Sequence, residues 1–434
     1  MEESMSNVFL SFLGTSDYKT CNYHYGNKIR KTVVFAQEAI LNFFCMHFKE
    51  NDKILIFLTE KAKEKNWEKN SKGIGLKETI ENLELPAQLI PVSIPEGNSE
   101  EEIWKIFEIV YEHLEPEDEV ILDITHSFRS IPMLTMVLLN YTRFLKDIKI
   151  KGIYYGAYEA RIGEDAPVFD LTSFERLQRW SIAAENFVNH GITDAIANLV
   201  YPQVNPLLKE SMGSNESAKA ESYFAKLLNR VGSYFSTVRG KRIYMGREIN
   251  RLKQNLNQVK EGELIIKPLR PLLDKVRQKI EAFKPESIDN MIEAVKWCIN
   301  HDLIQQGITM LQETIISYIL EENGLEWYAK DRATSEKKKK VKRLREDLSQ
   351  AIHLYGKNGD RNDWDYEFKI HSKIIKKVIE SESFQRLFKT NEKLRDLRND
   401  INHAGLIDDF EPGNFKDKLK SSFEEIKKII LYGG

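Results

Sequence analysis

Short apolar runs alternate with helical patterns over roughly the first 160 residues, and this alternation restricts the fold more than any other feature. The runs that read as strands are 8–14, 53–59, 88–94, 119–125 and 148–158. Between them the pattern predicts helices at 30–48, 60–84, 100–114 and 131–146. Runs such as ILIFL and VILDI are almost wholly apolar, which is typical of strands buried on both faces. We therefore predict an α/β domain: a mostly parallel, Rossmann-like sheet with helices on both sides and a ligand crevice at the carboxyl ends of its strands.

The strand signals stop after about residue 172, and the rest of the chain has a helical pattern. We predict three parts: an α/β domain over 1–172, a helical connector over 173–290, and an all-α domain over 291–434. Segment 291–321 reads as one long amphipathic helix or a helix pair, and 334–355, 364–388 and 414–432 read as helices. Helix breaks are expected at Pro202, Pro206, Gly240, Pro268, Pro271 and Pro285.

Composition excludes several classes of protein. The 434 residues carry a net charge of −2, which neither favours nor opposes a local basic patch. Cys21, Cys45 and Cys298 form no CxxC or CxxH pair, so neither a disulfide framework nor a zinc site is predicted. No apolar run approaches the length of a membrane span, and the acidic N-terminus does not read as a signal peptide. A cytoplasmic protein is expected.

Small and hydroxyl residues follow two of the predicted strands. The first strand ends at Gly14, Thr15 and Ser16, and the fourth ends at Thr125, His126, Ser127, Phe128 and Arg129. Such turns expose backbone N–H groups that favour an anion, and an arginine adds a bidentate clamp for phosphate. The sequences GxGxxG after the first strand and GxxxxGK[ST] anywhere are absent, which argues against an NAD enzyme and a P-loop NTPase. The alternative is that these are ordinary capped turns.

The sequence RNDINH near the C-terminus places Arg398, Asn399 and His403 close together on one predicted helix. RNA is cut without metal when its 2′-OH attacks the adjacent phosphorus, a reaction that needs proton transfer and positive charge on the phosphorane. Histidine and arginine supply these functions. A second histidine is missing, and a continuous helix turns by about 140° between Arg398 and His403. A dimer that brings two copies of the motif face to face would supply the second histidine. Arg398 and His403 would converge on one phosphate only if the helix ends there or if each subunit supplies part of the site, whereas the alternative interpretation is a polar helix end.

Together the two halves resemble a known family. The GTSD and DITHSFRS turns resemble those of a CARF domain (CRISPR-associated Rossmann fold). RNDINHAG resembles the Arg-x4–6-His motif of a HEPN ribonuclease domain, and NHDLIQQGITMLQE at 300–313 resembles the first helix of that domain. Order, spacing and length are similar to those of CARF–HEPN effectors of type III CRISPR systems, and the resemblance covers almost the whole chain.

The resemblance implies a homodimer whose CARF domains bind a cyclic oligoadenylate. Its ligand residues would be Gly14, Thr15, Ser16, Thr125, His126, Ser127, Phe128 and Arg129. A ring of four adenylates is expected, with six as the alternative, and His126 or Ser127 would cleave the ring if the CARF pocket degrades it. The HEPN pair would then cut single-stranded RNA through Arg398, Asn399 and His403, without metal, to 2′,3′-cyclic phosphate and 5′-hydroxyl products. Membrane contact and stable DNA binding are not expected.

Two questions stay open at this point. The basic run KKKKVKRLR at 337–345 is either an RNA-attracting face or a solvated helix. The helical half is either a ribonuclease or only a dimerisation domain of a cyclic-nucleotide sensor, and the second type of protein would tolerate the loss of His403.

Overall fold

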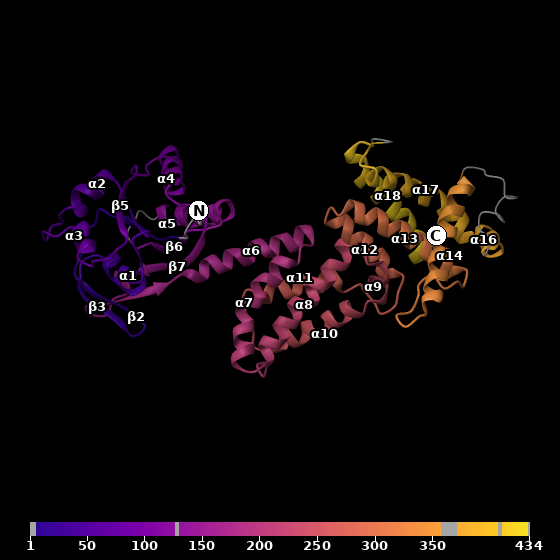
Figure 1. The fold of residues 1–434 in the computed structure, drawn as a ribbon, viewed down its shortest axis with the longest axis horizontal. Helices are drawn as coiled ribbons and strands as arrows, with labels where there is room; N and C mark the ends of the chain where they lie inside the picture. The colour runs from indigo at the N-terminus through magenta and orange to yellow at the C-terminus, as the bar shows by residue number, and fades with distance from the viewer. Residues whose placement is uncertain (1–5, 126–129, 357–370, 407–409, 433–434) are drawn as a thin grey trace. The chain divides into compact units, whose positions relative to one another are not determined.

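The computed structural model describes residues 6–125, 130–356, 371–406 and 410–432. The chain divides into two compact units, with the boundary between Gln178 and Arg179. The first unit is built on a β-sheet and the second is helical (Figure 1). The predicted fold class, an α/β domain followed by a helical region, is confirmed.

One eight-stranded sheet forms the centre of the first unit, in the order β3-β2-β8-β7-β6-β1-β4-β5. The five strands predicted from the apolar runs form a continuous parallel block. They are β1 (Asn7–Leu13), β4 (Lys53–Leu58), β5 (Gln88–Ser93), β6 (Glu119–Asp123) and β7 (Lys149–Gly156). Strand β1 lies between β4 and β6, with Ser11 paired to Asp123 of β6.

Three further strands were not predicted: β2 (Cys21–Tyr25), β3 (Lys28–Val33) and β8 (Asp165–Asp170). The β7–β8 and β2–β3 pairs are antiparallel, so the sheet is mixed. The predicted helix 30–48 is wrong at its start, because residues 30–33 belong to β3. This strand lies at the sheet edge and leaves most of KIRKTV exposed. A polar edge strand has no apolar run by which a sequence pattern could identify it.

Helices cover both faces of the sheet. Those of the first unit are α1 (Ala36–Phe44), α2 (Glu60–Ala62), the π-helical turn η1 (Lys63–Trp67), α3 (Leu76–Glu81), α4 (Glu100–Glu112), α5 (Ser130–Lys146) and the 3₁₀ turn η2 (Tyr158–Ala160). Successive residues of β1 alternate between two cores, because Phe9 packs with α1 whereas Val8 and Leu10 pack with α4 and α5. The predicted helix 60–84 is divided into α2, η1 and α3.

The second unit is helical throughout its described residues. Its helices are the end of α6 (Thr172–His190), α7 (Asp194–Glu210), α8 (Glu216–Ser236), α9 (Gly240–Met245), α10 (Arg247–Glu261), α11 (Leu269–Ile280), α12 (Asp289–Asn300), α13 (Ile304–Glu322), α14 (Ser335–Gly356), α16 (Ser372–Ile379), α17 (Glu382–Asn402) and α18 (Pro412–Tyr432). One hydrophobic core extends from Trp180 to Ile426. The division at residue 290 stays a prediction.

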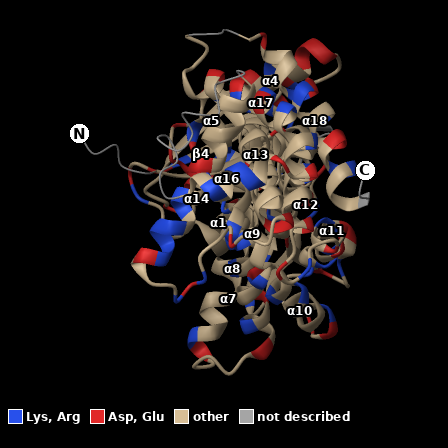
Figure 2. Ribbon diagram, turned by 90° about the vertical axis from the view of Figure 1, so that its right-hand side faces the viewer, with Lys and Arg blue, Asp and Glu red and all other residues tan. Residues whose placement is uncertain are grey.

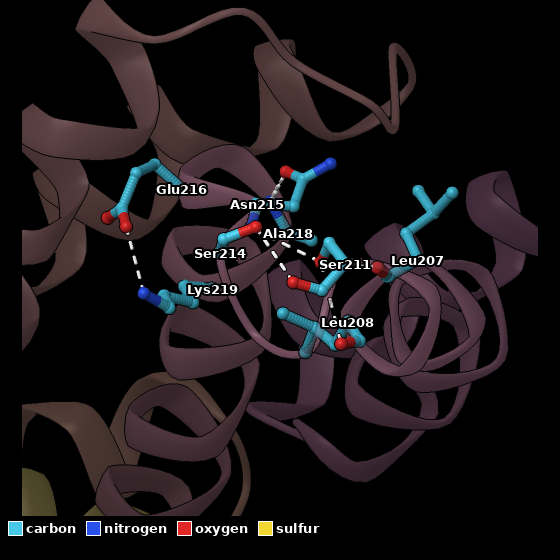
Figure 3. Close-up of polar contacts among 8 residues, drawn as sticks. All are labelled: Leu207, Leu208, Ser211, Ser214, Asn215, Glu216, Ala218 and Lys219. Atoms are coloured by element: carbon cyan, nitrogen blue, oxygen red, sulfur yellow. Dashed lines mark hydrogen bonds and ion pairs between the residues drawn. The ribbon is translucent and has the colours of Figure 1, made fainter.

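Helix α7 continues through Pro202 and Pro206, so the breaks predicted there are wrong. Its buried face, which includes Ile196 and Val204, outweighs the two backbone hydrogen bonds that the prolines remove. The helix ends later, where the Ser211 hydroxyl donates to the Leu207 carbonyl at 2.6 Å (Figure 3).

Segment 291–321 is a helix pair, one of the two predicted alternatives. Helix α12 ends at Asn300 and α13 begins at Ile304, with Asp302 between them in the left-handed region (φ 57°). The predicted helices 334–355 and 414–432 correspond to α14 and α18. The described part of segment 364–388 contains α16 and the start of α17 rather than one helix.

Candidate functional site

The two glycine- and hydroxyl-containing turns lie at the same edge of the sheet. Strands β1 and β6 are parallel neighbours, so the turn beginning at Gly14 and the turn that contains Thr125 both follow carboxyl ends. This is the juxtaposition that the strand pattern predicted. Residues His126 to Arg129 lie outside the described residues, so only Thr125 represents the second turn here.

A buried asparagine holds the first turn. The Asn66 side-chain amide, on η1, donates hydrogen bonds to the carbonyls of Gly14 (2.9 Å) and Ser16 (3.0 Å). The Gly14 N–H in turn donates to the Tyr18 hydroxyl at 3.0 Å. Asn66 and Tyr18 are buried, and burial raises the pKa of Tyr18 well above its usual value. Sequence analysis missed both residues, because they support the turn from outside its own motif.

A buried carboxylate organises the second turn. Asp123, the last residue of β6, is fully buried and accepts hydrogen bonds from the Ser11 hydroxyl (2.8 Å) and the Thr125 N–H (2.9 Å). The Thr125 hydroxyl donates to the same carboxylate and accepts a hydrogen bond from the Gly156 N–H at 2.9 Å. These contacts join the ends of β1, β6 and β7. Burial raises the pKa of Asp123 to about 6, although the hydrogen bonds from Thr125 and Ser11 oppose the shift.

Gly156 is required at the end of β7. A Cβ built on this residue would lie 2.8 Å from the Ala36 Cβ and 3.1 Å from Tyr23. The close approach of α1 to the strand end therefore leaves no room for a side chain next to Thr125.

Helix α17 carries the predicted catalytic motif and ends within it. Leu394 and Leu397 are buried and hold the helix to the core. His403 is the C-cap residue, and the N–H groups of Ala404 and Gly405 donate to the carbonyls of Ile401 (3.1 Å) and Asp400 (2.9 Å). This is a Schellman motif in which Ala404 is the first residue with positive φ and Gly405 is the second.

A cavity of about 870 Å³ lies beside α17, and we call it the α14–α17 cavity. Residues of α13, α14, α17 and the loop before α14 line it, together with the start of α9 and Met291. Arg398 and Arg395 line it from α17, and the Nε atom of each is buried without a hydrogen-bond partner among the described residues. His403 and Asn399 are not among the described residues that line it. Within this chain Arg398 and His403 therefore have different surroundings, the cavity for the arginine and an exposed helix end for the histidine.

The basic run at 337–345 forms the first half of α14 and has two kinds of residue. Val341 and Leu344 are buried, and Arg345 pairs with Glu313 and donates to the Trp327 carbonyl, so this arginine is structural. Lys338 and Lys342 are exposed and line the α14–α17 cavity.

The described residues were also compared with the requirements of a metal site and of a membrane-spanning helix. Among the described residues no group of three or more His, Cys, Asp or Glu side chains is placed to hold a metal ion. Over the same residues, no helix is both long and apolar enough to cross a membrane.

Comparison with known proteins identifies the first unit. Residues 8–159 match the model of the CARF domain of the CRISPR system endoribonuclease Csx1. These residues form a CARF domain. The expected resemblance to CARF-containing CRISPR effectors is confirmed.

Individual proteins with a similar sequence or structure include the following two. The CRISPR-associated protein MJ1674 of Methanocaldococcus jannaschii is 28% identical over 224 residues. The match covers 50% of this chain but only 32% of the relative, so the chain spans about a third of that protein's length. The solved structure of Enterococcus italicus Csm6 bound to cyclic hexa-2′-fluoro-hexa-dAMP aligns with 99% of this chain and 94% of its own, at 11% identity and a TM-score of 0.41.

Proposed function

We propose that this protein is an ancillary effector of a type III CRISPR system: a ribonuclease that a cyclic oligoadenylate activates by binding to its CARF domain. The observation that carries the proposal is the match of residues 8–159 to the CARF domain of an endoribonuclease. The helical unit that follows has Arg398 and His403 near the end of one helix.

The activator would bind where the ends of β1 and β6 meet. Thr15 and Ser16 would offer backbone N–H groups to phosphates, Gly14, whose N–H donates to Tyr18, would shape the turn, and Thr125 is fixed beside them by Asp123. His126, Ser127, Phe128 and Arg129 would complete the pocket, with Arg129 as the phosphate clamp. A ring of four adenylates, alternatively six, suits a pocket on a two-fold axis. Cleavage of the ring by His126 or Ser127 would limit the duration of the signal.

An exposed apolar stripe on α5 supports the homodimer. Met133, Val137, Tyr141 and Phe144 follow each other at intervals of three or four residues and are 73%, 61%, 50% and 63% exposed. Large side chains on one face of a helix at this level of exposure mark an interaction surface. A second copy of the same domain would cover this stripe and place two sets of turns near the two-fold axis.

The nuclease step would use residues of both subunits. His403 would take the proton from the 2′-OH as that oxygen attacks phosphorus, and Arg398 would stabilise the charge on the phosphorane. The bond to the 5′-oxygen breaks, and a protonated histidine returns a proton to that oxygen, which leaves a 2′,3′-cyclic phosphate and a 5′-hydroxyl. Asn399 would orient the phosphate. No metal takes part in these steps.

One observation favours a second candidate. Arg398 lines the α14–α17 cavity, whereas His403 is exposed and is not among the described residues that line it, so the cavity of a single chain does not hold both members of the Arg–His pair. A non-catalytic sensor of cyclic oligoadenylate, with a helical dimerisation domain, would need no such pair.

Cleavage of a fluorescent single-stranded RNA in EDTA separates the two candidates. Cyclic tetra- and hexa-adenylate are added separately to wild type and His403→Ala. We expect cutting only with one of the rings, and none by the variant. Cutting with neither ring, or equal cutting by His403→Ala, would favour the sensor.

A further inference from the structure

The α14–α17 cavity has a positively charged wall made by two helices. From α14 come Lys338, Lys342 and Arg345, and from α17 come Arg395 and Arg398. Figure 2 shows the basic residues of α14 in blue, next to the other helices of this unit. Lys241 of α9 also lines the cavity, whereas the acidic lining residues are Glu313 and Glu346. The lining therefore carries more positive than negative charge.

Only part of this positive charge is neutralised by ion pairs. Arg345 pairs with Glu313 inside the fold, and Lys241 pairs with Asp331 at 2.7 Å. Lys342 approaches Glu346 at 3.5 Å, but both side chains are largely exposed, so water screens this pair. Arg395 contacts the neighbouring, exposed Asp396 at 3.2 Å, while its Nε atom keeps no hydrogen-bond partner among the described residues. Lys338 and Arg398 have no ion-pair partner among the described residues. An anion in the cavity would thus meet cations that no carboxylate of the described chain occupies.

The cavity also has an aromatic and apolar floor. Trp327 and Tyr328, in the loop before α14, lie against it, together with Met310 and Ile316 of α13. Tyr328 is only partly buried. A cationic wall beside a partly accessible aromatic ring is a combination that binds single-stranded nucleic acid, because phosphates meet the cations and a base stacks on the ring.

The cationic residues of α17 lead from the cavity towards the end of the helix. Arg395, Arg398 and Asn402 are spaced by three and four residues and so lie on one face. Asn402 is the last residue of the helix, and His403 follows it as the C-cap. A strand that leaves the cavity along this face would reach the histidine within about two helical turns.

We propose that the α14–α17 cavity binds the single-stranded RNA substrate next to the phosphate that is cleaved. Lys338 and Lys342 of α14, with Arg395 of α17, contact backbone phosphates, and Tyr328 stacks on a base. This inference rests on the proposed ribonuclease function, since it assigns that function a substrate-binding site. RNA is favoured over an acidic protein segment because the aromatic floor suits a base.

The test compares two pairs of basic residues on the same helix. Lys338→Ala/Lys342→Ala removes the charges in the cavity, and Lys339→Ala/Arg343→Ala removes two exposed charges that do not line it. Both pairs are made in His403→Ala to prevent cleavage. Alanine favours a helix, so neither pair should unfold α14, and thermal melting checks this.

Fluorescence anisotropy then measures binding of a fluorescein-labelled single-stranded RNA, with the activating ring present. We expect the cavity pair to raise the Kd at least tenfold and the control pair less than twofold. Each phosphate contact on a single strand contributes about 0.7 to the slope of log K against log salt, so the cavity pair should lower that slope by about 1.4. In the cleavage-competent chain, the cavity pair should raise KM and leave kcat nearly unchanged.

Three results would overturn the inference. Equal losses of RNA affinity in the cavity pair and the control pair would mean that the whole surface of α14 attracts RNA. Unchanged affinity in both would mean that RNA binds at another site. Displacement of RNA by poly-glutamate at equal charge concentration would assign the cavity to an acidic protein segment. A failure of the proposed function can be distinguished from a failure of this inference. If wild type cuts no RNA but the cavity pair still weakens RNA binding, the cavity is an RNA-binding site and the protein is not a ribonuclease.

Discussion

Arg398 and His403 lie on the same helix but serve different surroundings: Arg398 lines the α14–α17 cavity, whereas His403 is exposed at the C-cap. The about 140° turn expected between these positions explains the difference. We therefore expect a ribonuclease built on this motif to take its arginine and its histidine from two subunits.

Mixed dimers test this arrangement directly. Arg398→Ala and His403→Ala subunits with different tags are co-expressed, and the heterodimer is purified through both tags. One of its two composite sites keeps both residues, so we expect about half of the wild-type cleavage rate, because a two-fold dimer has two equivalent sites. Each homodimeric variant should be inactive. A heterodimer as inactive as its parents would show that the residues act within one subunit.

A second prediction concerns the support of the first turn by Asn66. Asn66→Ala removes the donor to the Gly14 and Ser16 carbonyls, and we expect about tenfold weaker binding of the activator, which corresponds to about 1.4 kcal/mol. Asn66→Asp should bind still more weakly, because its carboxylate would face two carbonyl oxygens. Calorimetric titration with the cyclic oligoadenylate measures both effects. Asn82→Ala, at an exposed helix end, is the control, and the reverse order of the Ala and Asp variants would contradict the prediction.

A third prediction follows from the raised pKa of Asp123. Its pKa of about 6 in the folded chain exceeds the value of 3.8 expected when unfolded, so the folded state is favoured while the group is protonated. This stability is fully present below pH 4 and is lost as the pH rises through 6, an effect of about 3 kcal/mol. Asp123→Asn does not titrate and can still accept the hydrogen bonds from Thr125.

The melting temperatures of wild type and Asp123→Asn, compared from pH 4.5 to 7.5, measure this effect. As the pH rises, the melting temperature of Asp123→Asn should increase relative to that of wild type. A constant difference over this range would mean that Asp123 is ionised in the folded protein throughout.

The sequence was sufficient to predict the parallel strands of the sheet, because strands such as β1 and β4 are buried on both faces and appear in the sequence as apolar runs. The sequence pattern did not predict β3, because the side chains of this strand are mostly exposed. It also predicted breaks in α7 at the two prolines, but the helix continues because one of its faces is buried. Local patterns report burial well only when most of an element is buried.

The same limit applies to the site. Gly14, Thr125 and Arg398 belong to short motifs and were found from them. Asn66 contacts a turn about fifty residues earlier in the chain, and Lys338 meets Arg395 only in a cavity formed by separate helices. No local pattern contains such pairs. Tyr18, a few residues after Gly14, gave the one accessible signal: an aromatic side chain next to a polar turn.

The last prediction concerns the exposed stripe of α5. Val137→Glu/Phe144→Glu places two charges where we expect the two CARF domains to meet, and burying an unpaired charge costs several kcal/mol. The mass in solution should fall from twice 50.6 kDa to 50.6 kDa, as light scattering would show. Activator binding should be lost with it, because the ring needs both subunits. Ile74→Glu, at an exposed loop residue of the same unit, should remain a dimer. If the α5 variant also stayed dimeric and bound the activator normally, the two-fold axis would have to lie at another surface of the CARF domain.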